Sequence, residues 1–396
     1  MNILLLNEYF PPDTSATAKM AALVVGELSK RHHVTVLCGR PSYDPSERHP
    51  FYLRRRERQE SVTVERVGST TYPRFRMRHR VLNYLSYLAL AAPRALLIRA
   101  DVVLSMTDPP IMGIVAALVA LLKRRPFVYN IRDLYPDMAL GGRIVHPSFF
   151  VNLWEKLHRW ALRRAARVIV LGDDMRERVV AKGVQASRVV VIRDGVPIPE
   201  SLPPLEHPVS QEVRCGFPFV LLHAGNLGFY GAWDTLVKAA RELERDGVGL
   251  VFVGEGAKRA EIEAAAQGSP TVRFLPFRPA EHIPHVLAAG DLHVVTIQRG
   301  LEGVVVPSKL YGILAAGRAV LAVTPEESDV ARIVRRASCG VVADPDDPAA
   351  VVAAVRGLLA DRQKLAEMGA RARAIAGEYE RQKHLSLLAQ AIEAAG

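Results

Sequence analysis

Ser308 and Lys309 lie in the segment VPSKLYGILAAG, residues 306–317, which follows the apolar run DLHVVTI and ends at a glycine. Pro307 predicts a helix start, because the missing N–H of proline would be unpaired at that position anyway. Val306 is a poor cap, so backbone N–H groups near Ser308, Lys309 and Leu310 are expected to lack partners. A hydroxyl, a lysine and free amides together can bind a diphosphate. The alternative is that Ser308 caps the helix and Lys309 lies on a solvated face.

Two earlier turns have a similar build. The segment HAGNLGFYGAWD, residues 223–234, leaves an apolar run and enters a helical pattern, and VGEGAKRAEIE, residues 253–263, does the same. Their glycines permit positive φ and close approach of a ligand to the backbone, and Asn226 can donate two hydrogen bonds to phosphate oxygens. Each turn alone is an ordinary connection, whereas three such turns on one sheet favour a nucleotide site.

The first loop of the chain, residues 7–25, also runs from a strand into a helix. Asp13 or Ser15 can cap that helix, and Ala16 and Thr17 keep its first turn slim enough for a phosphate to approach. An ordinary capped helix is an equal alternative. The loop lacks the GxGxxG spacing of dinucleotide-binding folds, which argues against a nicotinamide-dependent dehydrogenase.

Two further loops, SMTDPPIMG and NIRDLYPDMALGGR, carry ionisable groups directly after apolar runs in the first half. Thr107 and Asp108 can contact a substrate or merely cap a helix. Asp133 can accept a proton or orient an acceptor hydroxyl, with Arg132 and Asp137 beside it. An ion pair between Arg132 and Asp133, or a loop cap, explains the same residues equally well.

The elements that position these loops are short apolar runs separated by helix-length segments. Continuous runs such as NILLLN and DVVLSM are typical of parallel strands covered on both faces. We predict an α/β fold of two doubly wound, Rossmann-like domains facing across a cleft. The domains span residues 1–198 and 218–377, a proline-rich linker spans 199–217, and a C-terminal helix at 378–396 completes the first domain. Ligands in such sheets bind at the carboxyl ends of strands.

The positive charge is confined to the first half of the 396-residue chain. Residues 1–200 hold 31 Lys+Arg and 18 Asp+Glu, whereas residues 201–396 hold 21 and 23. Arginines cluster at 52–58 and 72–80, just ahead of the apolar stretch 81–97. We expect this region to rest on an anionic membrane surface, and we expect no nucleic-acid partner. A helix packed in the domain interface with solvated arginines is the alternative.

The apolar runs and the cysteines indicate the cellular compartment. The longest uninterrupted apolar run, residues 111–122, falls short of the ~20 residues that span a bilayer, so no transmembrane helix is expected. Cys38, Cys215 and Cys339 are far apart and lack metal-ligand spacing, which argues against a zinc site or a disulfide framework. We expect a cytoplasmic protein, peripheral on the inner face of the plasma membrane.

These motifs resemble those of retaining glycosyltransferases of the GT-B fold, glycosyltransferase family 4. The similarity is greatest to the bacterial fucosamine-transferase-like and colanic-acid-type branch, which builds surface polysaccharides. It extends in order over residues 2 to about 345, and its carriers are NEYFPPDTSATA, DVVLSMTDPP, IRDLYPD, HAGNLGFYGAWD, FVGEGAKR and GVVVPSKLYGILAAG.

The resemblance implies a nucleoside-diphosphate-sugar donor held by the C-terminal domain and an acceptor saccharide held by the N-terminal one. The acceptor we expect is linked to a polyprenyl diphosphate. Transfer retains the anomeric configuration and needs no metal or other cofactor. The acceptor hydroxyl attacks from the leaving-group face, and the departing phosphate takes the proton.

The resemblance also implies roles for individual residues. Lys309 stabilises the leaving diphosphate and Asp133 is the second catalytic candidate. The residues expected around the donor are Ala16, Thr17, Gly225, Asn226, Gly228, Gly254, Glu255, Phe277, Arg278, Glu302, Gly303, Val304, Ser308 and Lys309. The residues expected on the acceptor side are Thr107, Asp108, Arg132 and Asp137.

Three positions depart from the family pattern. Arg132 stands where many members have a histidine, and Asn226 and Tyr230 stand where many have arginine and lysine. Gly312 replaces an expected glutamate that binds the ribose, so the nucleotide cannot be named from that contact. A transferase that forms small-molecule glycosides, a sugar-nucleotide epimerase on the same fold and a non-catalytic nucleotide-sugar-binding partner stay open as alternatives.

Overall fold

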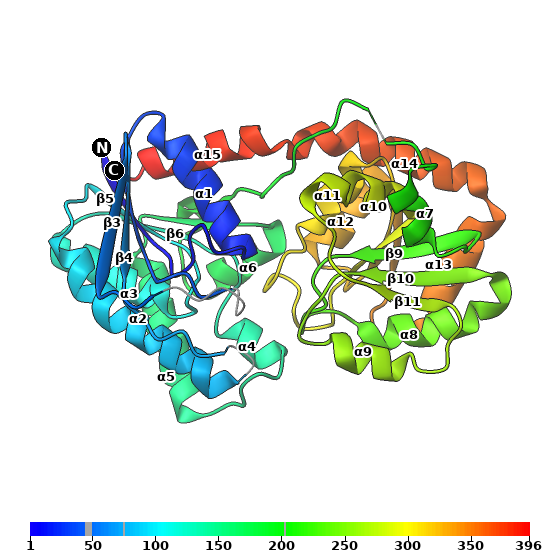
Figure 1. Cartoon of the computed structure of the whole chain (residues 1–396), viewed down its shortest axis with the longest axis horizontal. Coiled ribbons are helices and arrows are strands. Elements are labelled where there is room, and N and C mark those ends of the chain that lie inside the picture. The colour runs from blue at the N-terminus through cyan, green and yellow to red at the C-terminus, as the bar shows by residue number, and fades with distance from the viewer. Residues whose placement is uncertain (44–49, 74–75, 202) are drawn as a thin grey trace. The chain divides into compact units, whose positions relative to one another are not determined.

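The computed structural model of the protein describes residues 1–43, 50–73, 76–201 and 203–396. The chain forms two compact units, each built on its own parallel sheet with helices against it (Figure 1). Unit 1 comprises Met1–Ile192 and Lys383–Gly396, and unit 2 comprises Arg193–Gln382. The prediction of a two-domain α/β fold with parallel sheets is confirmed.

The sheet of unit 1 has the strand order β3-β4-β2-β1-β5-β6-β7-β8. Its strands are β1 Asn2–Leu6, β2 His33–Cys38, β3 Arg54–Gln59, β4 Val62–Val67, β5 Val102–Ser105, β6 Phe127–Asn130, β7 Arg167–Val170 and β8 Val189–Val191. Only the edge strand β3 is antiparallel to its neighbour. β3 contains most of the first arginine cluster, and Arg54 lies 2.7 Å from the buried carboxylate of Glu65. A charged edge strand discourages pairing with other chains.

The helices of unit 1 are α1 Ala16–Ser29, α2 Met77–Leu97, α3 Met112–Lys123, α4 Asp137–Gly141, α5 Phe149–Arg164 and α6 Asp173–Ala181, with a 3-10 turn η1 Ala186–Arg188. The last helix of the chain, α15 Arg381–Glu393, returns to this unit, where Leu385, Leu388 and Ile392 join its core. Each helix of the described ranges is too short or too polar to cross a bilayer.

The sheet of unit 2 has the order β11-β10-β9-β12-β13-β14, and all its strands are parallel. They are β9 Phe219–Ala224, β10 Val248–Val253, β11 Val272–Leu275, β12 Leu292–Thr296, β13 Ala319–Val323 and β14 Gly340–Ala343. The chain builds outward from β9 to β11, then returns to place β12 on the other side of β9. The carboxyl ends of β9 and β12 therefore flank a topological switch point, where doubly wound sheets bind ligands.

The helices of unit 2 are α7 Pro208–Arg214, α8 Trp233–Glu242, α9 Arg259–Ala265, α10 Ile283–Ala289, α11 Lys309–Ala315, α12 Asp329–Ala337, α13 Pro348–Ala360 and α14 Arg362–Ile375, with the 3-10 turns η2 Glu244–Asp246, η3 Ala280–His282 and η4 Ala376–Tyr379. The helix α7 lies inside the segment that the sequence predicts as a linker, 199–217. Its Val209 and Val213 are buried against Val220 and Leu222, so this part of the segment belongs to unit 2. The sequence does not predict this helix, because its two buried valines are four residues apart within a segment rich in proline.

Candidate functional site

The helix α11 begins at Lys309, two residues later than the sequence predicts. Ser308 occupies the cap position, but its side chain accepts no capping hydrogen bond. The N–H groups of Leu310 and Tyr311 donate to the carbonyl oxygens of Pro307 and Ser308, both at 3.2 Å. The expectation that the amide of Leu310 is a free donor is therefore wrong, because this tight first turn uses it. Within the described residues the N–H groups of Ser308 and Lys309 donate no hydrogen bond, so they stay available to an anion together with the side chains.

The side chain of Lys309 crosses from the start of α11 to the end of β9. Its Nζ lies 2.7 Å from Nε2 of His223, a fully buried residue of β9. The same Nζ lies 5.7 Å from the ring centroid of Tyr230. Within the described ranges, no carboxylate forms an ion pair with this lysine. Lys309 therefore does not extend along a solvated face. Its amine lies at the carboxyl end of β9, beside the switch point, and no described carboxylate neutralises it.

Burial lowers the pKa of Lys309 to about 7. Burial, and then the neighbouring Lys309, holds the pKa of His223 well below its usual value, so the imidazole is neutral and its Nε2 accepts a hydrogen bond from the ammonium. An anion that reaches Lys309 would favour its charged form. His223 was not singled out from the sequence, because the strand order that brings β9 beside the β12–α11 connection is not visible there.

Two glycines bring the ends of β9 and β10 close together. Gly225 has φ +141°, and a Cβ there would lie 3.2 Å from Cε of Lys309. Gly254 has φ +151°, and a Cβ there would lie 2.0 Å from the carbonyl oxygen of Gly225. Both positions therefore require glycine for backbone conformation and for space. Gly228 lies in the same turn, where a Cβ would come within 2.9 Å of the Asn226 side chain.

The other residues expected around the donor have varied partners. Asn226 is exposed, and its carbonyl accepts a 2.8 Å hydrogen bond from the Tyr230 hydroxyl. Phe277 is 54% exposed beside Gly254, which leaves its ring free to stack. Glu255 pairs with Arg259, and Arg278 pairs with Glu212 on α7. A donor must therefore compete with existing ion pairs to use Glu255 or Arg278.

The loop between β12 and α11 packs on its own side chains. Val304 and Leu301 are fully buried, so the apolar run in this loop needs no ligand to explain it. The carboxylate of Glu302 accepts a 2.7 Å hydrogen bond from the N–H of Gly300, and Gly303 has φ +67°. The loop is thus held in shape before any donor arrives.

In unit 1, Ser15 caps α1, since its hydroxyl accepts a 3.0 Å hydrogen bond from the N–H of Ala18. Asp13 instead accepts from the backbone N–H groups of Ser42 and Tyr43, each at 2.8 Å. Ala16 and Thr17 form the first turn of α1, where Ala16 is exposed. The capped-helix alternative therefore accounts for this loop.

The two loops that are expected on the acceptor side both approach one tyrosine. Burial, and then the charges of Asp133 and Asp108, hold the pKa of Tyr135 well above its usual value. Asp133 follows β6 and Asp108 follows β5, so the parallel strands bring both carboxylates toward one phenol, and Thr107 beside Asp108 is buried. Arg132 precedes Asp133 at the same strand end.

Asp137 is separate from this group. Its carboxylate lies 2.7 Å from Nζ of Lys182, which also lies 2.8 Å from Glu155. Asp137 therefore anchors α4 within unit 1. The sequence hides this role because Lys182 is distant along the chain. No three His, Cys, Asp or Glu side chains in the described part of the chain are grouped to hold a metal ion.

Comparison with known proteins bears on both units. Residues 16–195 match the family described as glycosyl transferase 4-like domain, and residues 218–361 match the glycosyl transferases group 1. Over 263 residues the chain is 26% identical to "Probable glycosyltransferase WbjE" of Pseudomonas aeruginosa, with 64% of each chain covered. The match thus spans less than two thirds of that relative.

Another relative and a solved structure align over longer ranges. The chain is 29% identical to a 2-deoxystreptamine glucosyltransferase of Streptomyces kanamyceticus, over 80% of this chain and 87% of that one. The crystal structure of Anabaena Alr3699/HepE with UDP and glucose superposes with a TM-score of 0.73 over both full chains, at 18% identity. At that identity the superposition concerns the fold alone.

Proposed function

The chain belongs to the glycosyltransferases of the GT-B fold and family 4, and on that premise we propose that it transfers a sugar from a nucleoside-diphosphate sugar to a hydroxyl acceptor with retention of configuration. The donor binds at the carboxyl edge of the unit 2 sheet. The acceptor is a saccharide, which unit 1 holds through Thr107, Asp108, Arg132 and Asp133.

One observation supports this proposal: Lys309 holds its amine at the switch point of unit 2, and none of the carboxylates that the structure describes forms an ion pair with it. A buried cation without a counter-ion is costly unless its site receives an anion. Gly225 and Gly254 let the ends of β9 and β10 pack closely beside this lysine, so larger side chains there would displace it or the backbone. A structural lysine would instead have been paired, as Lys182 is with Asp137 and Glu155.

The chemistry follows from this charge. When the bond between the sugar and the diphosphate breaks, negative charge develops on the leaving oxygen, and the Lys309 ammonium stabilises it. His223 accepts one ammonium hydrogen and so orients the remaining two toward the phosphates. The acceptor hydroxyl attacks from the leaving-group face, and its proton passes to the departing phosphate. In this proposal the transfer needs no metal.

The acceptor we propose is linked to a polyprenyl diphosphate at the inner face of the plasma membrane. The outward face of α2 supports this, because Leu82, Leu85 and Leu97 are all exposed and the helix contains no acidic residue. Part of the positive charge expected for docking is already neutralised, since Arg54 and Arg94 both pair with Glu65. Arg74 and Phe75, in the second arginine cluster, lie outside the described residues.

Flotation with anionic liposomes over a salt series tests the membrane step by itself. Binding at low salt that weakens as salt rises supports the docking face. Absence of binding at low salt would remove membrane docking from the proposal and leave the transfer reaction untouched.

Saturation-transfer NMR with UDP-, GDP- and TDP-sugars tests the reaction, followed by turnover assays with the donor that binds. Transfer to a lipid-linked saccharide supports the full proposal. Transfer only to a soluble aminocyclitol would favour the alternative of a transferase that forms small-molecule glycosides. The match to the 2-deoxystreptamine glucosyltransferase suggests this class of acceptor for the test. Binding of a nucleotide sugar without transfer or hydrolysis would contradict an enzymatic role.

A further inference from the structure

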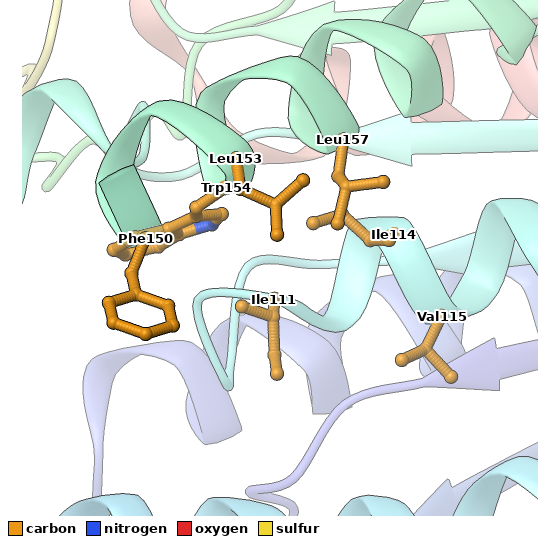
Figure 2. Close-up of a pocket in the computed structure, with 7 residues that line it drawn as sticks. All are labelled: Ile111, Ile114, Val115, Phe150, Leu153, Trp154 and Leu157. Carbon is orange, nitrogen blue, oxygen red and sulfur yellow. The ribbon is translucent and has the colours of Figure 1, made fainter. Parts of the chain in front are cut away.

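An apolar pocket of about 230 Å³ opens between the starts of α3 and α5 in unit 1. The side chains of Ile111, Ile114 and Val115 form one wall, and those of α5, including Phe150 and Trp154, form the other (Figure 2). No charged side chain lines it. Phe150 is 78% exposed at the pocket mouth. A concave apolar surface with an exposed aromatic side chain at its edge is typical of ligand-binding pockets.

The pocket is continuous with the proposed acceptor loops. Ile111 directly follows the Thr107–Pro110 segment, so one wall of the pocket is the end of that loop. Trp154 stacks on Tyr135, with ring centroids 5.8 Å apart and planes 18° apart. Tyr135 is the phenol whose pKa is raised by burial and then by the charges of Asp133 and Asp108. A ligand with its polar end at these loops would therefore place an attached chain in the pocket.

Polar groups around the pocket favour an anionic head group. On α5, the exposed Lys156 and Arg159 flank the lining residue Leu157, and the single carboxylate of this helix, Glu155, is paired with Arg159 and Lys182. The indole N–H of Trp154 is buried and has no hydrogen-bond partner in the described structure. Buried donors are normally satisfied, so an incoming oxygen at this edge of the pocket would complete it.

We propose that this pocket binds the first isoprene units of the polyprenyl diphosphate that carries the acceptor saccharide. The inference rests on the proposed function and adds the site at which the lipid chain is held. The apolar walls take the hydrocarbon, while the basic side chains and the Trp154 N–H face the diphosphate. The chain then fixes the acceptor saccharide beside Asp133 and Asp108, which a membrane surface alone would not do.

Photocrosslinking of the full chain tests this site. The probe is farnesyl diphosphate with a diazirine in its chain, used without vesicles, and the labelled peptides are mapped by mass spectrometry. We expect labels within residues 111–115 or 150–157. Val115→Phe, which fills the pocket, and Phe150→Ala, which removes an exposed wall, should each lower labelling about tenfold. Leu387→Trp, at an exposed leucine on α15, is the matched control and should label as the parent does.

Other outcomes would overturn the site. These are labelling elsewhere, labelling unchanged by Val115→Phe and Phe150→Ala, and labelling that requires vesicles. Dimers in sedimentation that Phe150→Ala dissociates, without labelling, would assign the surface to a second copy of the chain. UDP binding is measured on the same variants. Intact UDP binding without labelling rejects the pocket alone, whereas labelling without any nucleotide binding rejects the proposed donor function.

Discussion

Nζ of Lys309, at the start of α11, lies 2.7 Å from Nε2 of His223 at the end of β9. The two residues are far apart in sequence and meet only because β12 lies beside β9 in the sheet. The contact places a cation with a lowered pKa at the switch point, and it decides how the donor site responds to pH and to substitution.

Binding of UDP is expected to take up a proton near pH 8. The free Lys309 has a pKa of about 7, so it is largely neutral at pH 8, and an adjacent diphosphate raises its pKa and charges it. Affinity should therefore be constant below pH 7 with respect to this group and fall as pH rises above it. Calorimetry at pH 8 in buffers of different ionisation enthalpy measures the uptake, since phosphate groups are already ionised there. Lys309→Met should abolish it; unchanged uptake in that variant would assign the proton to another group.

Replacing His223 should weaken the donor site without removing it. His223→Phe removes the acceptor that orients the ammonium, and we expect kcat/KM for the donor to fall about tenfold. His223→Gln keeps an acceptor and should recover most of that loss. Thermal melts of both variants distinguish the loss of the hydrogen bond from a loss of stability caused by altered packing against Trp233. Equal activity of the two variants at equal stability would show that the hydrogen bond has no role.

Gly254→Ala should be destabilising by about 1–3 kcal/mol and should weaken nucleotide binding, since the new Cβ meets the Gly225 carbonyl at 2.0 Å and the φ of +151° is unfavourable. Gly357→Ala is the control, because a Cβ in that exposed part of α13 has no neighbour within 4 Å. The control should be neutral or stabilising by up to about 1 kcal/mol. Denaturant melts measure both. A stable Gly254→Ala protein would contradict the close approach of β9 and β10.

Gly312 offers a test of the missing ribose contact. A Cβ there would meet only Leu287, at 3.5 Å, an ordinary van der Waals contact, so the position accepts a Cβ without moving the backbone. Gly312→Glu should fold as stably as the parent and, if the proposed donor site is correct, bind UDP more tightly through the ribose hydroxyls. Gly312→Gln is the matched variant without the charge. Titration with UDP and with inorganic diphosphate shows which part of the ligand is contacted, because a ribose contact raises the affinity for UDP alone. An equal gain in affinity for both ligands would contradict a ribose contact.

The sequence predicts the two sheets well because parallel strands buried on both faces appear as continuous apolar runs, as in β1 and β5. The sequence also predicts that Lys309 follows a strand, because the apolar run DLHVVTI precedes its segment. It does not reveal His223 as the partner of Lys309, or Lys182 as the partner of Asp137, because both contacts depend on which strands and helices become neighbours. It also misses α7, whose two buried valines lie within a proline-rich segment.

The central claim is that Lys309 stabilises the leaving diphosphate, and turnover of Lys309→Ala with the donor chosen from the NMR panel tests it most directly. The account predicts a loss of roughly 10²–10³ in kcat, comparable to removal of one oxyanion donor. Lys238→Ala, at an exposed lysine on α8, should keep parental turnover. Parental turnover by a folded Lys309→Ala protein would contradict the account.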